Sequence, residues 1–222
     1  MILKEPNIDR IGEGMKVEKF ATGILGTNTY LVINEDTKQA VVVDPAALPK
    51  RLKNYIFDND LKIEAVLLTH GHFDHIMGVD IFVDELEVPV VYVHENDAPM
   101  MESPALNLSN VYTRGYTFSK YTCIRDKQVL KHAGMEFQVI HTPGHTSGGV
   151  SYYVAEHNVL FSGDTLFQTS IGRTDFETSS MSDMVRSIRE KLFALPDDTL
   201  VYPGHMGETK IGYEKKYNPY VV

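Results

Sequence analysis

Apolar residues near the start of the chain occur in short runs that end in turn-forming residues. The runs cover residues 17–22, 28–34 and 40–43, and the third one ends at Asp44 and Pro45. Short runs rich in Val, Ile, Thr and Tyr and bounded by Gly, Asn, Asp or Pro are typical of β-strands. This pattern predicts that the chain opens with antiparallel strands.

The apolar spacing changes after Pro45, where helical and strand-like patterns begin to alternate. Near-helical spacing predicts helices over residues 48–57, 76–86 and 95–101. Continuous apolar runs predict strands over residues 65–68 and 90–93. The segment from residue 102 to 122 has no clear period, so it is predicted to be an irregular loop that could act as a lid.

The second half of the chain is again rich in strand-like runs and then contains one amphipathic segment. Strands are predicted over residues 136–141, 149–154 and 159–161. Ser180 and Asp183 form a capping-box pattern at the start of a helix that Pro196 ends. Its apolar stripe, which we expect to pack on a sheet rather than on a partner, consists of Met181, Met184, Val185, Ile188, Leu192 and Leu195.

Composition narrows the class of protein. The 222 residues are 43% hydrophobic and contain no fixed-period repeat, low-complexity tract or linker, so residues 1–222 are expected to fold as one domain. The formal net charge of −9 and the lack of a Lys/Arg-rich run argue against a nucleic-acid partner.

Cysteine usage and the N-terminal sequence bear on the cellular compartment. Cys123 is the only cysteine, so no intrachain disulfide can form, and its side chain is expected to pack as a small apolar group. Residues 1–7 carry charge where a signal peptide needs an apolar run, and no later stretch is long enough to span a membrane. We therefore expect a cytoplasmic protein without a membrane partner.

A dense cluster of possible metal ligands follows the apolar run 65–68. Three histidines and one aspartate lie within six residues, at His70, His72, Asp74 and His75. Imidazole and carboxylate groups suit Zn²⁺ and Fe²⁺, and one ion rarely needs so many ligands. Loops that follow strands are common places for binding sites. The motif therefore predicts a site that can serve two adjacent ions.

Three further candidate ligands each follow a strand-like run and a glycine. They are His145 after Gly144, Asp164 after Gly163 and His205 after Gly204. This placement would bring separate loops to one edge of the sheets, and the glycines would let the backbone approach a crowded site.

The order His-x-His-x-Asp-His, followed by His, Asp and His, resembles the metallo-β-lactamase superfamily over nearly the whole chain. The resemblance implies an α+β fold, the four-layer αββα sandwich. It implies two divalent metal ions, in the first instance Zn²⁺, with Fe²⁺ or Mn²⁺ as alternatives. It assigns one ion to His70, His72 and His145 and the other to Asp74, His75 and His205, with Asp164 bridging both.

Within that superfamily, residues 161–167, 171–175, 211–214 and 218–220 are similar to the short glyoxalase II-like branch, which is related to the persulfide dioxygenases. Classical β-lactamases resemble the chain less. Full-length glyoxalase II has a further C-terminal helical domain that helps to bind glutathione, whereas this chain ends 17 residues after His205. Recognition of glutathione is therefore an open question.

The resemblance implies a hydrolase in which a metal-held hydroxide attacks a small-molecule thioester, such as a hydroxyacyl-glutathione, or an ester. Asp74 is expected to orient the water or shuttle its proton. Arg173 either binds an anionic group of the substrate or pairs with Asp175. Two alternatives stay open, an iron-dependent persulfide dioxygenase and a non-catalytic metal-binding or ligand-binding protein, and so does the oligomeric state.

Other polar and aromatic residues have two interpretations each. Asp44 is either a hydrogen-bond partner of a ligand histidine or a turn residue. The aromatic residues of the predicted loop either line a substrate pocket or anchor the loop, and they are Tyr112, Tyr116, Phe118 and Tyr121. Structural roles are expected for the remaining histidines His94, His132, His141 and His157.

Overall fold

The N-terminal half of the chain builds the first of two mixed β-sheets in the computed structural model, which describes residues 14–221. The strands in their order across this sheet are β1 (Met15–Thr22), β2 (Thr27–Asn34), β3 (Gln39–Val43), β4 (Lys62–Leu67), β5 (Val91–His94) and β6 (Thr122–Ile124). The first three strands pair antiparallel, as predicted, and the later ones pair in parallel.

The second sheet is built from the C-terminal half of the chain. Across the sheet its strands are β14 (Thr209–Lys210), β13 (Leu200–Pro203), β10 (Val159–Gly163), β9 (Val150–Val154), β8 (Met135–His141) and β7 (Val129–His132). Only β10 and β13 pair in parallel. A short hairpin of β11 (Leu166–Phe167) and β12 (Ser170–Ile171) lies beside it.

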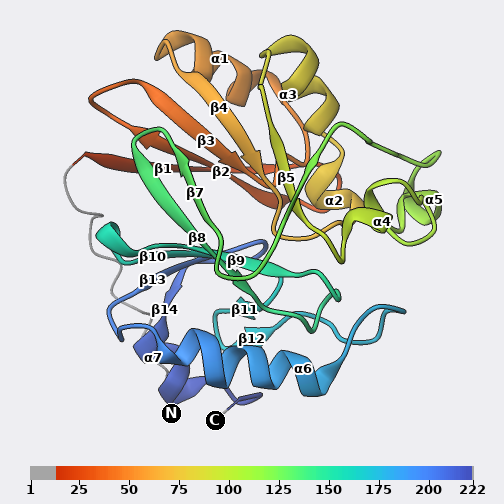
Figure 1. Ribbon diagram of the computed structural model, residues 1–222, viewed down its shortest axis with the longest axis vertical. Helices are drawn as coiled ribbons and strands as arrows, with labels where there is room; N and C mark the ends of the chain where they lie inside the picture. Colours follow the sequence, from red (N-terminus) through yellow and green to blue (C-terminus); the bar gives the residue numbers. More distant parts are fainter. Residues whose placement is uncertain (1–13, 222) are drawn as a thin grey trace.

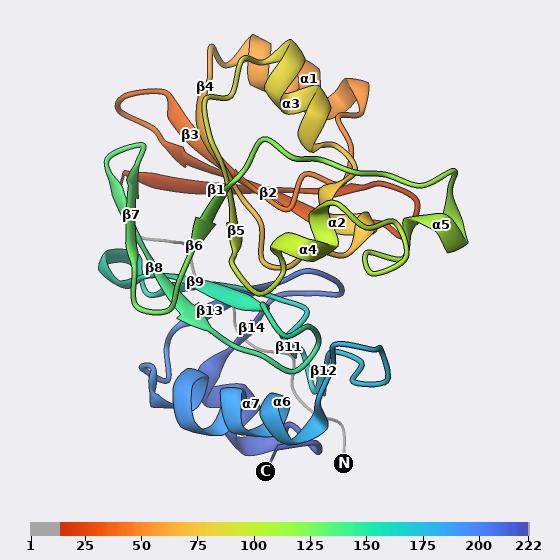
Figure 2. The ribbon, with the colours of Figure 1, turned by 45° about the vertical axis from the view of Figure 1, so that its right-hand side comes forward.

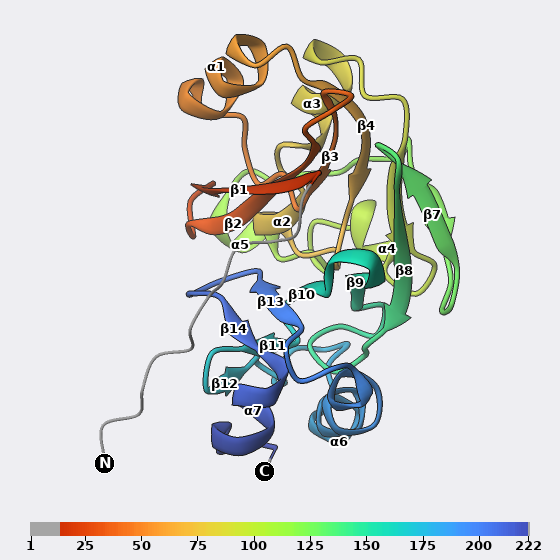
Figure 3. The ribbon, with the colours of Figure 1, turned by 90° about the vertical axis from the view of Figure 1, so that its left-hand side faces the viewer.

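The two sheets pack face to face, and helices cover both outer faces (Figure 1). The first sheet is covered by α1 (Lys50–Asp58) and α3 (Val79–Glu85), and the second by α6 (Met181–Arg186) and α7 (Ile211–Tyr217). The same four layers are seen after turns of 45° (Figure 2) and 90° (Figure 3). This is the predicted four-layer αββα sandwich.

Each central strand is apolar on both faces because both faces are covered. In β3, Val41 and Val43 contribute to the core between the sheets, whereas Ala40 and Val42 contribute to the core under α1 and α3. Successive side chains of a strand point to opposite faces, so a doubly covered strand appears as a continuous apolar run. The strands that carry the candidate ligands are therefore held from both sides.

The helix expected over residues 76–86 is interrupted. It forms as α2 (Phe73–Ile76) and α3, with Gly78 between them. A Cβ atom at Gly78 would lie 2.5 Å from the carbonyl oxygen of Pro45. The backbone N–H of Gly78 donates to the same oxygen at 2.8 Å instead of to a carbonyl of the preceding helical turn, so the helical hydrogen-bond pattern is interrupted here.

The helix expected over residues 180–195 forms with changes of pitch. After α6 the chain continues as a π-helical turn, η2 (Ser187–Lys191), and a 3₁₀ turn, η3 (Leu192–Ala194). Ser180 caps the helix by accepting a hydrogen bond from the backbone N–H of Asp183 at 3.3 Å. Met184 is fully buried but Met181 is exposed, so the buried stripe begins one turn later than predicted.

Other short elements differ from the sequence pattern. The helix expected over residues 95–101 is only α4 (Ala98–Met101), and the predicted irregular segment contains α5 (Ser109–Tyr112). The strand-like run expected before Gly204 is β13 (Leu200–Pro203), whereas the pattern does not predict β6, β7, β14 or α7. A 3₁₀ turn, η1 (Ala155–His157), links β9 to β10.

The expectation about residues 1–7 lies outside the described part of the chain. Within residues 14–221 each helix is either too short or too polar to cross a lipid bilayer. Cys123 was expected to pack as a small apolar group, but it is exposed on the edge strand β6. That expectation is wrong because Cys123 alternates along this edge strand with the buried Ile124 and so lies on the other face, where its side chain is exposed.

Candidate metal centre

Four of the predicted ligands lie where β4 ends. His70 and His72 are in the loop between β4 and α2, and Asp74 and His75 are in α2 itself. All four are buried, and His75 is completely inaccessible. The rigid, doubly covered strand β4 therefore delivers these side chains to one edge of the sandwich.

The other three predicted ligands come from the second sheet at the same edge. His145 follows β8, Asp164 follows β10 and His205 follows β13. His145 Nε2 lies 3.5 Å from Asp164 Oδ2, and His205 Nε2 lies 3.2 Å from Asp74 Oδ2. The structure thus brings all seven predicted residues together from both halves of the chain.

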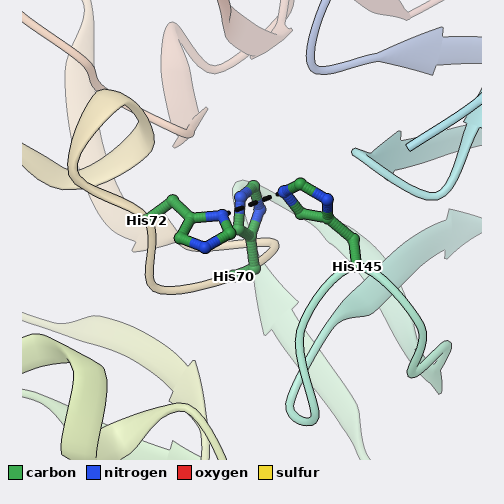
Figure 4. A group of neighbouring side chains, drawn as sticks. All are labelled: His70, His72 and His145. Carbon is green, nitrogen blue, oxygen red and sulfur yellow. Dashed lines mark hydrogen bonds between the residues drawn. The ribbon is translucent and has the colours of Figure 1, made fainter. Parts of the chain in front are cut away.

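The seven side chains fall into overlapping groups of three whose ligand atoms lie within 4.8 Å of one another. The first group is His70, His72 and His145, whose rings converge from two different loops (Figure 4). His72 Nδ1 and His145 Nε2 are 2.9 Å apart. The remaining groups are His70, His75 and Asp164, and Asp74, His75 and His205.

Unpartnered polar atoms show that this donor set suits cations. Among residues 14–221 four buried side-chain polar atoms have no hydrogen-bond partner, and three of them belong to this cluster: His70 Nε2, His75 Nε2 and Asp164 Oδ1. Each unpartnered buried polar atom costs about 1–3 kcal/mol. Imidazole nitrogens and carboxylate oxygens at these separations fit a pair of divalent ions, with Asp164 placed between the two groups.

The outer nitrogen of three histidines is held by an acceptor, which fixes the tautomer. His75 Nδ1 lies 2.9 Å from Asp44 Oδ2, and His145 Nδ1 lies 2.8 Å from the carbonyl oxygen of Arg173. Thr69 Oγ1 donates its proton to Asp44 at 2.6 Å and therefore accepts from His70 Nδ1 at 3.1 Å. In each ring the Nε2 atom is left facing the centre, as a metal ligand requires.

The structure shows which of the two expected roles Asp44 has. It is buried, contacts His75 and accepts two hydrogen bonds from Thr69, one of them from the backbone N–H at 2.8 Å. Its backbone also has a φ of 49°, in the left-handed region that Asp tolerates better than most residues. Asp44 therefore serves as both a turn residue and a partner of the cluster.

The electrostatics of the cluster differ from one histidine to the next. Burial, and then the neighbouring histidines, lower the pKa of His70 well below its ordinary value. Burial also opposes charge on His75, but Asp74, Asp164 and Asp44 together outweigh it and raise the pKa of His75 to about 10. The same three carboxylates would attract any cation placed at His75 Nε2, whether a proton or a metal ion.

Asp74 is held as an ionised carboxylate. Burial raises its pKa, but His75 and His205 more than offset this effect, so that the pKa lies well below its ordinary value. Its Oδ2 atom also accepts a hydrogen bond from Thr27 Oγ1 at 3.0 Å. An ionised, buried carboxylate is able both to bind a cation and to accept a proton.

Glycine is required next to two of the ligands. A Cβ atom at Gly204 would lie 2.3 Å from Asp164 Oδ1 and 2.7 Å from His75 Cε1. At Gly163, where φ is 51°, it would lie 2.3 Å from Thr69 Oγ1. The predicted close approach of the backbone to the site is therefore present at both positions.

Sequence reasoning missed several residues that hold the ligand loops. Asp97 is fully buried and joins the loop of His72 to the loop of His145. Asn28 Nδ2 donates to the carbonyl oxygens of Pro203 and Met206 at 3.0 Å each and so holds the loop of His205. A single Asp or Asn in a polar stretch gives no spacing signal, so only the tertiary structure reveals these roles.

The structure distinguishes the roles of the remaining candidate residues. The Arg173 guanidinium forms a bidentate pair with Asp175, with distances of 3.0 and 2.8 Å, which is one of the two arrangements expected. Tyr112 lies beside the cluster, whereas Tyr116 and Tyr121 pack against the core under α1 and α3. His94, His132, His141 and His157 lie outside the three ligand groups.

The family can be decided at this point. A model of the metallo-beta-lactamase superfamily matches residues 22–205, a range that includes all seven clustered residues. The chain belongs to the metallo-beta-lactamase superfamily.

Two curated relatives narrow the position within the superfamily. A probable metallo-hydrolase from Streptococcus pyogenes is 38% identical over 216 residues, which cover 93% of this chain and 90% of the relative. Hydroxyacylglutathione hydrolase GloC from Haemophilus influenzae is 34% identical over 197 residues, which cover 86% and 91% of the two chains. These similarities support the glyoxalase II-like branch of metallo-hydrolases.

Two solved structures share most of the fold. The BLEG-1 B3 metallo-beta-lactamase is 38% identical with a TM-score of 0.88 and covers 93% of this chain and 100% of its own. TTHA1623 in a di-iron-bound form is 35% identical with a TM-score of 0.79 and covers 92% of this chain and 100% of its own. BLEG-1 is thus about as similar in sequence to this chain as GloC is, whereas the DIM-1 metallo-beta-lactamase is only 18% identical.

Proposed function

We propose that this metallo-hydrolase cleaves a small-molecule thioester, for which hydroxyacyl-glutathione is the reference substrate, or an ester. The observation that carries the proposal is the convergence of seven buried or half-buried ligands around unpartnered nitrogen and oxygen atoms. The similarity to GloC supports the thioester as substrate. We further propose a cytoplasmic location, which fits the single cysteine.

The proposed ligands are His70, His72 and His145 for one divalent ion and Asp74, His75 and His205 for the other, with Asp164 between them. Zn²⁺ is the ion we propose first, and the di-iron-bound form of TTHA1623 makes Fe²⁺ the main alternative. The ions, when bound, supply Lewis acidity and a water molecule whose pKa is lowered toward about 7.

The reaction needs a water molecule to add to the carbonyl carbon while the carbon–sulfur bond breaks. The sulfur leaves as a thiolate that takes up a proton, and the acyl group leaves as a carboxylate. We assign to Asp74 the orientation of that water and the transfer of its proton, because this ionised carboxylate lines the open pocket beside the cluster. Thr27 and His205 hold its Oδ2 atom in place.

Zinc-loaded protein should hydrolyse at least one thioester of a panel containing S-lactoylglutathione and neutral acyl thioesters. His72→Ala, which removes a proposed ligand that lines the pocket, should lower kcat/KM by at least about a hundredfold and reduce the bound metal. His157→Gln, a substitution in η1 outside the ligand groups, should change neither quantity. Turnover that is equal in His72→Ala and in the unchanged protein would refute the proposal.

The persulfide dioxygenase alternative predicts different observations. It requires about one iron per chain and consumption of O₂ with a thiol persulfide, whereas the hydrolase requires no O₂. Oxygen-electrode measurements with the iron-loaded protein therefore separate the two reactions. Detection of neither reaction with either metal is the result that the third alternative, a site that binds metal or ligand without turnover, predicts.

A further inference from the structure

A pocket of about 390 Å³ opens over the candidate metal centre. Its lining includes His72, Asp74, His145, Asp164 and His205, which places the proposed ligands at one side of the pocket. The volume lies in the range of small-molecule sites. Since the ligand atoms would engage the reacting carbonyl, the other walls decide which thioesters or esters fit.

One wall of the pocket is apolar and comes from the first half of the chain. It consists of Leu25 in the turn between β1 and β2, Leu108 before α5, and Tyr112 in α5. The ring of Tyr112 stacks on Phe73, with a centroid distance of 4.8 Å and an interplanar angle of 13°. This stacking presents the second face of the Tyr112 ring as a flat apolar surface.

A second part of the wall is also apolar and comes from the second half of the chain. Phe167 and Ile171 belong to the hairpin of β11 and β12, and Phe176 follows it. The Phe176 ring lies 5.0 Å from the ring of His72 and 5.5 Å from that of His145. An apolar chain attached to a reacting carbonyl would therefore meet aromatic and aliphatic carbon from both halves of the chain.

The only Lys or Arg among the described residues that line this pocket is already paired. Arg173 forms two hydrogen bonds with Asp175, and its guanidinium lies 4.6 Å from the centroid of the Phe176 ring. Both members of the pair are more than half exposed, and the Asp175 carboxylate places a negative charge directly beside the guanidinium of Arg173. Carboxylates such as those of glutathione would find no free side-chain cation on these walls.

The mouth of the pocket shows the same chemistry. Among residues 14–221 nine large apolar side chains are exposed, and three of them, Leu25, Tyr112 and Met206, also line the pocket. Single exposed apolar residues are ordinary, but a concentration of them around one pocket indicates an apolar ligand.

From these walls we infer that the substrate is a thioester or ester whose part away from the metals is neutral and apolar. A short or medium acyl chain on an uncharged thiol fits this description, whereas an anionic glutathione conjugate does not. This inference rests on the proposed function. It narrows the substrate class of the same site.

The first test uses a series of neutral thioesters. S-acetyl-, S-butyryl- and S-hexanoyl-N-acetylcysteamine are compared with S-lactoylglutathione on the zinc-loaded protein. We expect kcat/KM to rise about threefold to fourfold per added methylene, the value expected for burial of one CH₂ group. S-hexanoyl-N-acetylcysteamine should exceed S-lactoylglutathione by at least about tenfold.

A matched pair of variants locates the effect in the pocket. Leu25→Ser removes a side chain that lines the pocket, whereas Ile24→Ser removes an equally apolar, exposed neighbour in the same turn that does not line it. We expect Leu25→Ser to reduce the gain per methylene and Ile24→Ser to leave it unchanged. Equal effects of the two substitutions would overturn the assignment of this wall.

A second pair of variants tests the pairing of Arg173. Asp175→Ala frees the guanidinium and should raise kcat/KM for S-lactoylglutathione by about threefold or more, with little change for the neutral thioesters. Glu136→Gln removes a similarly exposed ion pair, the one with Lys131 on β7. It should leave kcat/KM unchanged for S-lactoylglutathione and for the neutral thioesters. No gain for the anionic substrate in Asp175→Ala would contradict the inference.

Binding measurements distinguish failure of the inference from failure of the proposed function. Saturation-transfer NMR with the thioethers S-hexyl-N-acetylcysteamine and S-methylglutathione reports pocket binding without turnover. Preferred binding of the neutral thioether supports the inference even if no thioester is cleaved, in which case only the proposed function fails. Efficient cleavage of S-lactoylglutathione with no gain per methylene overturns the inference and leaves the proposed function standing.

Discussion

Asp44 is the residue beyond the seven proposed ligands on which the site depends most directly. Replacing it with Asn would remove the charge beside His75 and disturb the tautomer that directs Nε2 toward the centre. We predict that Asp44→Asn lowers metal affinity by about tenfold to a hundredfold, measured by competition with a chromophoric chelator. Asp60→Asn is a matched control, because Asp60 is exposed and has a similar φ of 53°. Equal affinities in the two variants would contradict the role of Asp44.

His94 should make stability depend on pH. Burial has the largest effect and lowers the pKa of His94 to about 4, together with His141, whose ring stacks on it at 4.2 Å. Lys191 also lowers this pKa, whereas Glu95 and Asp126 raise it. Between pH 6.5 and 4 the unfolded chain therefore binds more protons at this position than the folded chain does. Stability is fully present above pH 6.5 and falls as the pH decreases through this window.

We predict that His94→Gln flattens the pH dependence of the free energy of unfolding between pH 4 and 6.5. The slope should decrease by up to about 1.4 kcal/mol per pH unit, the value for one proton. Denaturant titrations at several pH values measure this slope, with His157→Gln as the control. An unchanged slope in His94→Gln would show that burial does not suppress protonation of this histidine.

At the residue scale the sequence predicts ligand types and loop positions but not the contacts around them. The three-histidine, one-aspartate motif is dense enough to stand out, and the Gly-His and Gly-Asp pairs mark strand ends. Asp97 and Asn28 bind backbone groups that lie far away in sequence, so no local pattern marks them. The local sequence around Asp44 fits a turn residue and a partner of a ligand histidine equally well, and only the tertiary contact with His75 reveals the second role.

At the scale of elements, Asp97 joins the two loops that carry the first ligand group. Its Oδ2 accepts from the backbone N–H of Gly71 at 3.0 Å and from Thr146 Oγ1 at 2.7 Å, and its Oδ1 accepts from the N–H of Gly148 at 2.6 Å. Burial raises the pKa of Asp97, and these three hydrogen bonds act against that rise. The carboxylate can accept all three bonds, whereas an amide cannot.

We predict that Asp97→Asn destabilises the protein by about 1–3 kcal/mol and weakens metal binding, because at least one buried donor loses its acceptor. Thermal unfolding with and without metal measures both effects. Asp84→Asn, a substitution of an exposed aspartate in α3, is the control. Metal affinity that stays at the level of the control would mean that Asp97 has only a structural role.

Element boundaries show where the sequence pattern is informative. Long apolar runs predict β2, β3 and β9 closely, because these strands are covered on both faces. The break at Gly78 depends on contact with Pro45, which a helical period cannot reveal. The strands β13 and β14 are two to four residues long, so their register depends on the neighbouring strand β10 and on each other.

At the scale of the whole molecule, the two sheets share one central core. Tyr30 and Val41 from the first sheet pack with Tyr152 and Phe161 from the second. The proposed metal ligands also come from both sheets. We therefore propose that residues 1–222 form one cooperative domain.

This proposal predicts a single unfolding transition. Far-ultraviolet and near-ultraviolet circular dichroism, the latter reporting on the buried tyrosines, should give coincident midpoints. Removing metal with a chelator should lower both midpoints together, because ions that bind only the folded state stabilise it. Two separate transitions would show that the sheets unfold independently.

Metal content of the purified protein, measured by elemental analysis, tests the central claim most directly. The two ligand groups joined by Asp164 predict about two divalent ions per chain in the unchanged protein and a clear loss in His72→Ala and in His205→Ala. One ion per chain that persists in His205→Ala would contradict a dinuclear centre. An absence of bound metal after incubation with Zn²⁺ or Fe²⁺ would contradict the whole account of the site.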